Sequence, residues 1–135
     1  MVYTSNSDTA TSDSFTFKVN DGTVDSTAAT VSITITGEND APVAVANTLT
    51  VAEDASITNT DVIANDTDAD GDTLSLTAVT TAGSGTVAVN ADELSVDYTP
   101  AANFNGTEVI TYTVSDGTDT TNGTFTITVT AVNDA

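Results

Sequence analysis

The chain has 135 residues, with one Lys, no Arg, no His, no Cys and 20 acidic residues, which together give a net charge of −19. That balance argues against nucleic acid and anionic membranes as partners, because both require a basic surface, and no apolar run is long enough to insert into a membrane. Without Cys, His or Arg the chain also lacks disulfides, thiolate metal sites and most machinery for acyl or phosphoryl transfer, so we expect no enzyme.

The composition favours β-structure. Thr occupies 30 positions, and Val and Ile are also frequent. These β-branched residues pack well on pleated sheets and lose side-chain freedom in helices. No stretch repeats its apolar residues at the spacing of a helix, so we expect an all-β fold.

Two segments of the chain resemble each other. "FTFKVNDGTVDSTAATVSITITGENDA", residues 15–41, aligns with "ITYTVSDGTDTTNGTFTITVTAVNDA", residues 110–135, at an offset of 95 residues that becomes 94 after a gap in the turn. A period of this length is typical of tandem domains. The sequence therefore predicts that 41–135 is one complete repeat and that 1–40 is the C-terminal part of a preceding repeat, namely its last two strands and a linker.

The incomplete repeat poses a question of its own. Its two strands alone would leave Phe15, Phe17, Val31 and Ile33 exposed, because an isolated hairpin buries little apolar surface. Disorder, folding back and pairing with another chain all remain open from the sequence.

In the complete repeat, alternation of apolar and polar residues marks about seven short strands. The expected inward residues, strand by strand, are Val43, Val45, Leu49 and Val51; Ile57 and Ile63; Leu74 and Leu76; Val87 and Val89; Leu94, Val96 and Tyr98; Ile110, Tyr112 and Val114; and Phe125, Ile127 and Val129. Gly and Pro punctuate the turns, and the last two strands carry mostly Thr on their other face. This pattern indicates a Greek-key β-sandwich of the immunoglobulin type.

The loop after the second strand holds an unusual concentration of charge. "NDTDADGD", residues 65–72, places Asp66, Asp68, Asp70 and Asp72 on alternate positions. The run D-x-D-x-D-G is the first half of an EF-hand-type calcium loop, in which alternate residues present oxygens and Gly permits the turn. Counting Asp66 as the first position, the twelfth is Thr77 and not the bidentate Glu, so the remaining ligands have to come from elsewhere in the fold.

An immunoglobulin-like topology brings further oxygens to the same place. The loop 65–72 and the last hairpin turn, which carries Asp116, lie at the end of the sandwich where the chain enters, here called the proximal end. The incoming stretch "GENDAP" adds Glu38, Asn39 and Asp40. We therefore expect a calcium site there, since Ca²⁺ takes six to eight oxygen ligands. The alternatives are an acidic coat for solubility in salt and Asp side chains that only bend turns through Asx hydrogen bonds.

The sequence also indicates a second, weaker calcium site at the opposite end, where the chain leaves the sandwich. This end is here called the distal end. Glu53 and Asp54 lie in the loop after the first strand, and Asn133 and Asp134 follow the last strand. Only two of these acids are adjacent, so the signal is weaker than in the loop 65–72.

The motifs resemble those of a known family. The stretches "GENDAP" at 37–42 and "AVNDA" at 131–135 resemble the linkers of cadherin repeats, and "ED" at 53–54 is similar to the acidic pair of their first loop. The set "VAEDA…NDTDADGDTL…YTP…NFNGT…TYTVSDG…VNDA" resembles the cadherin-like tandem repeats of large bacterial surface or secreted adhesins, often of the RTX type. The resemblance covers 41–135 and most of 1–40. No clear counterpart exists near 98–106 of the basic-centred motif that adds distal ligands in animal cadherins.

The resemblance implies an immunoglobulin/cadherin-like sandwich and an extracellular, secreted or cell-surface location, with roles in adhesion and biofilm formation. It also implies that Ca²⁺ rigidifies the junction between neighbouring repeats. The ligands it implies are Glu38, Asn39, Asp40, Asp66, Asp68, Asp70, Asp72 and Asp116. The partners are then neighbouring repeats of the same chain, with cell-surface glycans or homophilic contacts as additional possibilities. The alternative function is a calcium-dependent carbohydrate-binding module, which glycan binding that is abolished by a chelator would distinguish from a spacer.

Overall fold

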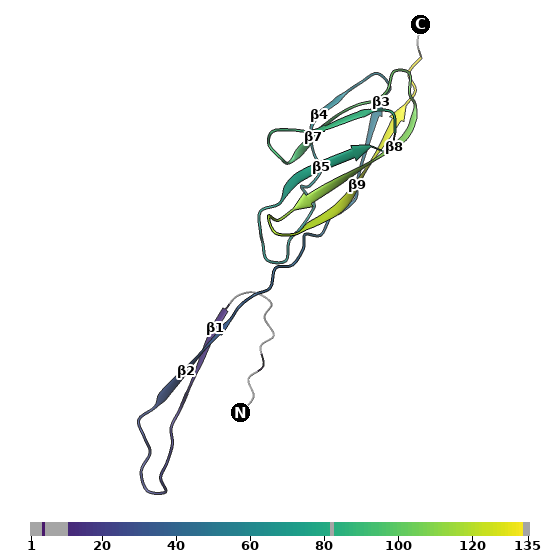
Figure 1. The fold of residues 1–135 in the computed structure, drawn as a ribbon. Coiled ribbons are helices and arrows are strands. Elements are labelled where there is room, and N and C mark those ends of the chain that lie inside the picture. The colour runs from purple at the N-terminus through teal and green to yellow at the C-terminus, as the bar shows by residue number, and fades with distance from the viewer. Residues whose placement is uncertain (1–3, 5–10, 82, 134–135) are drawn as a thin grey trace. The chain divides into compact units, whose positions relative to one another are not determined.

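The structure is a computed structural model that describes residue 4 and residues 11–81 and 83–133. The chain divides into two compact units, Met1–Asn39 and Asp40–Ala135. All nine strands of the described residues are assigned to sheets, and no helix of membrane-spanning length and hydropathy occurs among these residues. The expected all-β architecture is confirmed (Figure 1).

The first unit is a β-hairpin. Strands β1 (Thr11–Phe17) and β2 (Ala29–Ile35) pair antiparallel, with Phe15 opposite Val31. In the long turn, Asp21 Oδ1 accepts hydrogen bonds from Thr23 N and Val24 N, both at 2.9 Å. These hydrogen bonds hold the pKa of the Asp21 carboxyl below its usual value.

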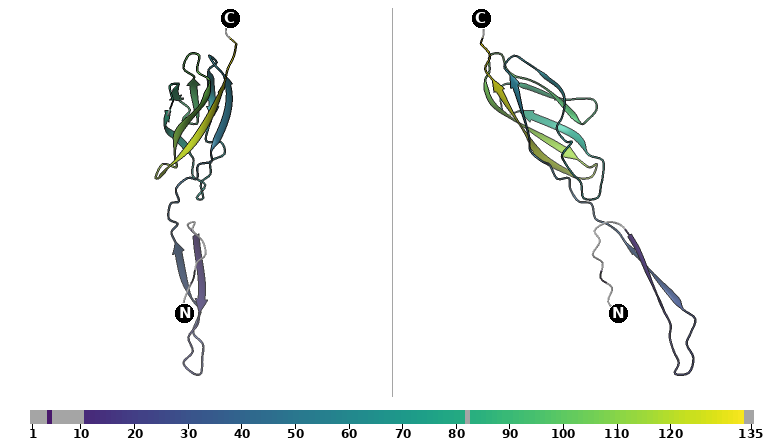
Figure 2. Two further views of the ribbon diagram at one scale, coloured as in Figure 1. Left: turned by 90° about the vertical axis from the view of Figure 1, so that its right-hand side faces the viewer. Right: turned by 180° about the vertical axis from the view of Figure 1, so that it is seen from behind.

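The second unit contains the other seven strands, as the alternation predicts. They are β3 (Asn47–Ala52), β4 (Ile57–Asp61), β5 (Ser75–Thr81), β6 (Thr86–Val89), β7 (Ser95–Thr99), β8 (Gly106–Ser115) and β9 (Thr120–Thr130). One sheet has the order β3-β9-β8-β5 and the other the order β4-β7-β6. Figure 2 shows the two sheets layered on each other. The first strand of the unit, β3, pairs parallel with the last, β9, while the other pairings are antiparallel, so the Greek-key sandwich is confirmed.

The core lies between the two sheets and is supplied mainly by one face of β8 and β9. Ile110, Tyr112 and Val114 of β8 and Ile127 of β9 are each 0% exposed. Alternation places these side chains inward and Thr outward, because successive residues of a strand face opposite sides. Gly123 lies opposite Tyr112 in the register, and an added Cβ there would clash with the Tyr112 ring, so only glycine leaves room for this aromatic side chain.

Two sequence predictions about the core need correction. The first strand of the complete repeat begins at Asn47, and Val43 and Val45 are 57% and 42% exposed. The alternation that includes them is broken because Val43 forms an isolated antiparallel bridge with Thr67 instead of joining β3. Leu94 is also exposed, because the turn before β7 still includes it.

A buried carboxylate connects the two sheets. Glu108, in β8, is 3% exposed and lies on the inward face of the strand. Its Oε2 accepts a hydrogen bond from the Tyr98 hydroxyl at 2.8 Å, and its Oε1 accepts from Ser84 N at 2.8 Å and Gly85 N at 3.1 Å. Burial alone would raise the pKa of Glu108, but the hydrogen bonds from Tyr98, Gly85 and Ser84 outweigh it and hold that pKa below its usual value.

Candidate metal site at the proximal end

The loop between β4 and β5 is fixed at the proximal end by backbone contacts on both sides. Val43 N donates to Thr67 O at 2.7 Å and Thr67 N donates to Val43 O at 3.1 Å, so the incoming chain lies directly beside the loop. Ser75, where the loop ends, pairs with Ser115, where the turn to β9 begins. The structure therefore brings the incoming chain, the acidic loop and the last hairpin turn to one end, as expected from the topology.

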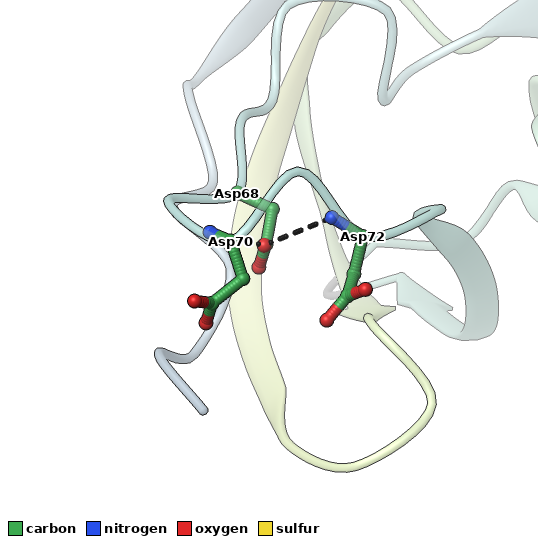
Figure 3. Close-up of side chains that lie close together, drawn as sticks. All are labelled: Asp68, Asp70 and Asp72. Carbon is green, nitrogen blue, oxygen red and sulfur yellow. Dashed lines mark hydrogen bonds between the residues drawn. The ribbon is translucent and has the colours of Figure 1, made fainter. Parts of the chain in front are cut away.

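Three of the four alternate aspartates form a cluster. Asp68, Asp70 and Asp72 each offer a carboxylate oxygen, and these oxygens lie within 4.8 Å of one another. Figure 3 shows the three side chains extending to the same side of the loop. Asp68 Oδ1 accepts hydrogen bonds from Asp70 N at 2.9 Å and Asp72 N at 3.1 Å, which curls the loop around this side chain. Gly71 has φ 79°, a conformation that favours glycine.

Asp66 has a different environment from the other three. Its Oδ1 accepts a hydrogen bond from Val45 N at 2.7 Å and lies 3.0 Å from the Tyr112 hydroxyl, which donates to it. Burial raises the pKa of Tyr112, and the hydrogen bond to Asp66 raises it further. Asp66 therefore connects the incoming chain to the core through Oδ1, while its Oδ2 is not used in these hydrogen bonds.

Two carboxylate oxygens of the loop are buried without a hydrogen-bond partner. They are Oδ2 of Asp66 and Oδ2 of Asp68. A buried carboxylate oxygen without a hydrogen-bond partner is costly, and the second unit, residues 40–135, contains no Lys, Arg or His that could compensate its charge. A divalent cation is a partner that such an oxygen can take, and the carboxylate oxygens gathered by Asp68, Asp70 and Asp72 suit Ca²⁺. The residues present therefore fit a calcium ion.

The other predicted ligands of the proximal end are placed as follows. Asp40 N donates a hydrogen bond to Asp70 Oδ2 at 2.8 Å, so the incoming backbone is tied to the cluster. Asp116 Oδ1 accepts from Thr118 N at 2.6 Å and from Asp119 N at 2.7 Å, the pattern of an Asx turn. Glu38 and Asn39 belong to the first unit. A role in binding metal stays a prediction for all four residues.

At the distal end, Glu53 holds the outgoing chain. Its side chain is 8% exposed, and its Oε1 accepts a hydrogen bond from Val132 N at 2.5 Å. Asp54 Oδ1 accepts from Asn103 N at 3.2 Å. Asn133 is the last residue described, and Asp134 lies outside the described residues. The metal cluster found among the described residues includes none of these side chains, and the distal site stays a prediction.

The sequence placed Tyr112 in the core but did not indicate its hydrogen bond to Asp66, and it assigned no structural role to Glu108. The sequence pattern could have shown that Glu108 faces inward. It lies an even number of residues before Ile110, Tyr112 and Val114 in the same strand, so it shares their face. The hydrogen bond from Tyr112 to Asp66 had no such signal, because it joins residues 46 positions apart.

The chain is similar to a protein family and to several solved structures. A family model described as "Bacterial Ig domain" matches residues 39–130. The endo-fucoidan hydrolase MfFcnA4 from glycoside hydrolase family 107 has 26% sequence identity and a TM-score of 0.53, over 92% of this chain and 19% of that chain. A variant of the same enzyme has 25% identity with the same TM-score and coverage. Mouse clustered PcdhgC3 EC1-3 has 12% identity and a TM-score of 0.41, over 91% of this chain and 42% of that chain. No curated protein matches the chain.

Proposed function

The chain belongs to the bacterial Ig domain family, and from this premise we propose that it is a calcium-binding structural repeat of an extracellular bacterial adhesin. In this role Ca²⁺ rigidifies the junction between neighbouring repeats. Residues 1–40 are, in the same proposal, the C-terminal part of a preceding repeat.

One observation carries the calcium proposal. Asp68, Asp70 and Asp72 bring carboxylate oxygens within 4.8 Å of one another, and Oδ2 of both Asp66 and Asp68 is buried without a hydrogen-bond partner. Asx turns explain the Oδ1 atom of Asp68, which accepts two backbone N–H groups, but they leave its Oδ2 without a role. A cation gives that oxygen a role.

The chemistry of the proximal end follows from its charges. Several carboxylates repel one another within one loop and beside the incoming chain, which Asp40 N and Val43 already tie to that loop. When bound, Ca²⁺ supplies the positive charge that this set lacks. Because the folded loop gathers oxygens that the unfolded chain disperses, binding stabilises the folded state. Glu38, Asn39 and Asp116 are further ligands in this proposal.

The extracellular and adhesive parts of the proposal rest on the sequence. The linker stretches "GENDAP" and "AVNDA" and the acidic loop resemble those of cadherin-like repeats in large bacterial adhesins, including those of the RTX type. An acidic chain suits a calcium-containing exterior, because millimolar Ca²⁺ is found there and weak extracellular calcium modules bind at about 10⁻⁴–10⁻³ M. Neighbouring repeats are then the first partners of the chain.

Calorimetric titration of the full chain with Ca²⁺ tests the site. We expect Asp68→Asn together with Asp70→Asn to reduce the uptake by at least one ion per chain, because two negative ligands are lost. Asn keeps the acceptor oxygen that Asp68 offers to the backbone N–H groups of the loop, so the loop conformation is retained. Asp21→Asn with Asp25→Asn, in the turn of the first unit, is the control of equal charge change. Unchanged uptake in the loop variant would place the ion elsewhere.

A second candidate, a calcium-dependent carbohydrate-binding module, is favoured by the similarity to an endo-fucoidan hydrolase, of which this chain spans 19%. In that case a bound ion coordinates sugar hydroxyls directly. We expect no retention of the chain by fucoidan or by a glycan array in about 5 mM Ca²⁺, which is roughly five times the weakest dissociation constant of an extracellular module. Retention that is lost when EDTA is added would replace the spacer by this second function.

A further inference from the structure

The hairpin β1–β2 carries a row of apolar side chains on one face, and the described part of its own unit has no further strand to cover that face. Phe17 is 45% exposed and Val31 is 36% exposed. Within the part of the chain that the structure describes, β1 and β2 pair only with each other. A two-stranded hairpin is marginally stable by itself, and its outer edges are templates for further strands.

The pairing of the hairpin reproduces that of β8 with β9. In β1–β2, Phe15 lies opposite Val31 and Asp13 lies opposite Ile33. The sequence repeat aligns these four residues with Ile110, Phe125, Glu108 and Ile127, and in β8–β9 Ile110 lies opposite Phe125 and Glu108 opposite Ile127. The two hairpins therefore share one register as well as a similar sequence, although the turns between their strands differ by one residue.

The size of the side chains is compensated between the two hairpins. Where β8–β9 pairs a smaller Ile110 with a larger Phe125, β1–β2 pairs a larger Phe15 with a smaller Val31. Volume-conserving exchanges of this kind are the ones that packed cores tolerate. A solvent-facing strand has no need for such compensation, so the apolar face of the hairpin is suited to a core.

We infer that the face of β1–β2 is an acceptor surface for a chain segment of the β3–β7 kind, which completes a second sandwich on the hairpin. The second unit defines what this segment has to supply: a strand parallel to the last strand of the hairpin, a strand antiparallel to the first, and a covering sheet of three strands. The inference requires no calcium, and it rests on the proposal that residues 1–40 are the C-terminal part of a preceding repeat.

The register makes the contacts specific. In the second unit Leu49 and Val51 of β3 lie beside Ile127 and Val129 of β9. By the same alignment a β3-type strand lies beside β2 with its Leu and Val at the level of Ile33 and Ile35. Asp13 then occupies the position of Glu108, whose carboxylate accepts hydrogen bonds from a tyrosine and from the loop before β6.

Fusion of residues 41–99 directly before Ser5, in place of residues 1–4, tests the inference, because this segment includes all of β3–β7. This junction keeps the offset of 95 residues, under which Tyr3 aligns with Tyr98. We expect amide hydrogen exchange at Phe15 and Val31 to slow by at least about 100-fold, because a packed sandwich opens far less often than a hairpin. The slowing is expected both in Ca²⁺ and in EDTA. The result can therefore be interpreted even if the calcium proposal fails.

Two controls make the result decisive. A fusion with the residues of 41–99 in scrambled order should leave the exchange at β1 and β2 fast, and so should the ordered fusion with Phe17→Asp, which places a charge on the apolar face. Amide signals of β8 and β9 report that the second unit is intact in every variant. Fast exchange in the ordered fusion, docking of the added segment on β8–β9, or equal slowing with the scrambled segment overturns the inference.

Discussion

Saturation with Ca²⁺ is expected to raise the melting temperature of the chain by about 10 °C or more over its value in EDTA. At one hundred times the dissociation constant, a single site that binds only the folded state adds about 2.7 kcal/mol. For a domain of this size each kcal/mol corresponds to roughly 4–8 °C. The bound ion also offsets the mutual repulsion of the carboxylates of Asp68, Asp70 and Asp72, which lie close together.

Two comparisons establish the origin of the shift. Mg²⁺ should raise the melting temperature less, since it demands octahedral geometry and gives up its water reluctantly. The variant Asp68→Asn with Asp70→Asn should melt at a similar temperature in EDTA and in Ca²⁺, since its ligand set is incomplete. Superimposable melting curves of the native chain in the two solutions would rule out a stabilising ion.

Replacement of Glu108 by Ala is expected to destabilise the second unit by about 3 kcal/mol or more. The substitution leaves a cavity at a site that is 3% exposed, and it removes the acceptor for the Tyr98 hydroxyl and for the backbone N–H groups of Ser84 and Gly85. Buried donors without an acceptor cost about 1–3 kcal/mol each. Urea denaturation measures the loss, and Glu93→Ala at an exposed turn should change stability by less than about 0.5 kcal/mol.

The same carboxylate makes stability depend on pH. Because the pKa of Glu108 is lower in the folded chain than in the unfolded one, its contribution is fully present above the unfolded value and is lost as the pH falls through the folded value. The advantage of the native chain over Glu108→Gln should therefore be constant from about pH 7 to 5 and should shrink below about pH 4. An advantage that grows on acidification would show that the carboxyl is protonated in the native state.

Most of the fold could be predicted from alternation alone. In β8 and β9 the pattern extends over 10 and 11 residues, so the inward set that includes Tyr112 and Phe125 was clear from the sequence. The start of β3 could not be predicted, because Val43 and Val45 continue its alternation while backbone pairing with Thr67 removes Val43 from the strand. A local sequence pattern cannot reveal a contact with a residue 24 positions away.

The candidate site was predicted in part for the same reason. Four acids on alternate positions of a loop indicated a cation site, and three of them form the cluster in the structure. Asp66 continues the same sequence pattern, but the fold places its Oδ1 against the Tyr112 hydroxyl and Val45 N. Only the packing of β8 against the incoming chain separates Asp66 from its neighbours, and a sequence motif carries no information about that packing.

A crystal structure of the full chain grown with Ca²⁺ is the most direct test of metal binding by the acidic loop. If the loop binds Ca²⁺, the structure should contain an ion about 2.3–2.6 Å from carboxylate oxygens of Asp68, Asp70 and Asp72. The ion should also contact at least one of the buried Oδ2 atoms of Asp66 and Asp68. Density for water alone among these side chains, at a saturating concentration of Ca²⁺, would contradict calcium binding by the loop.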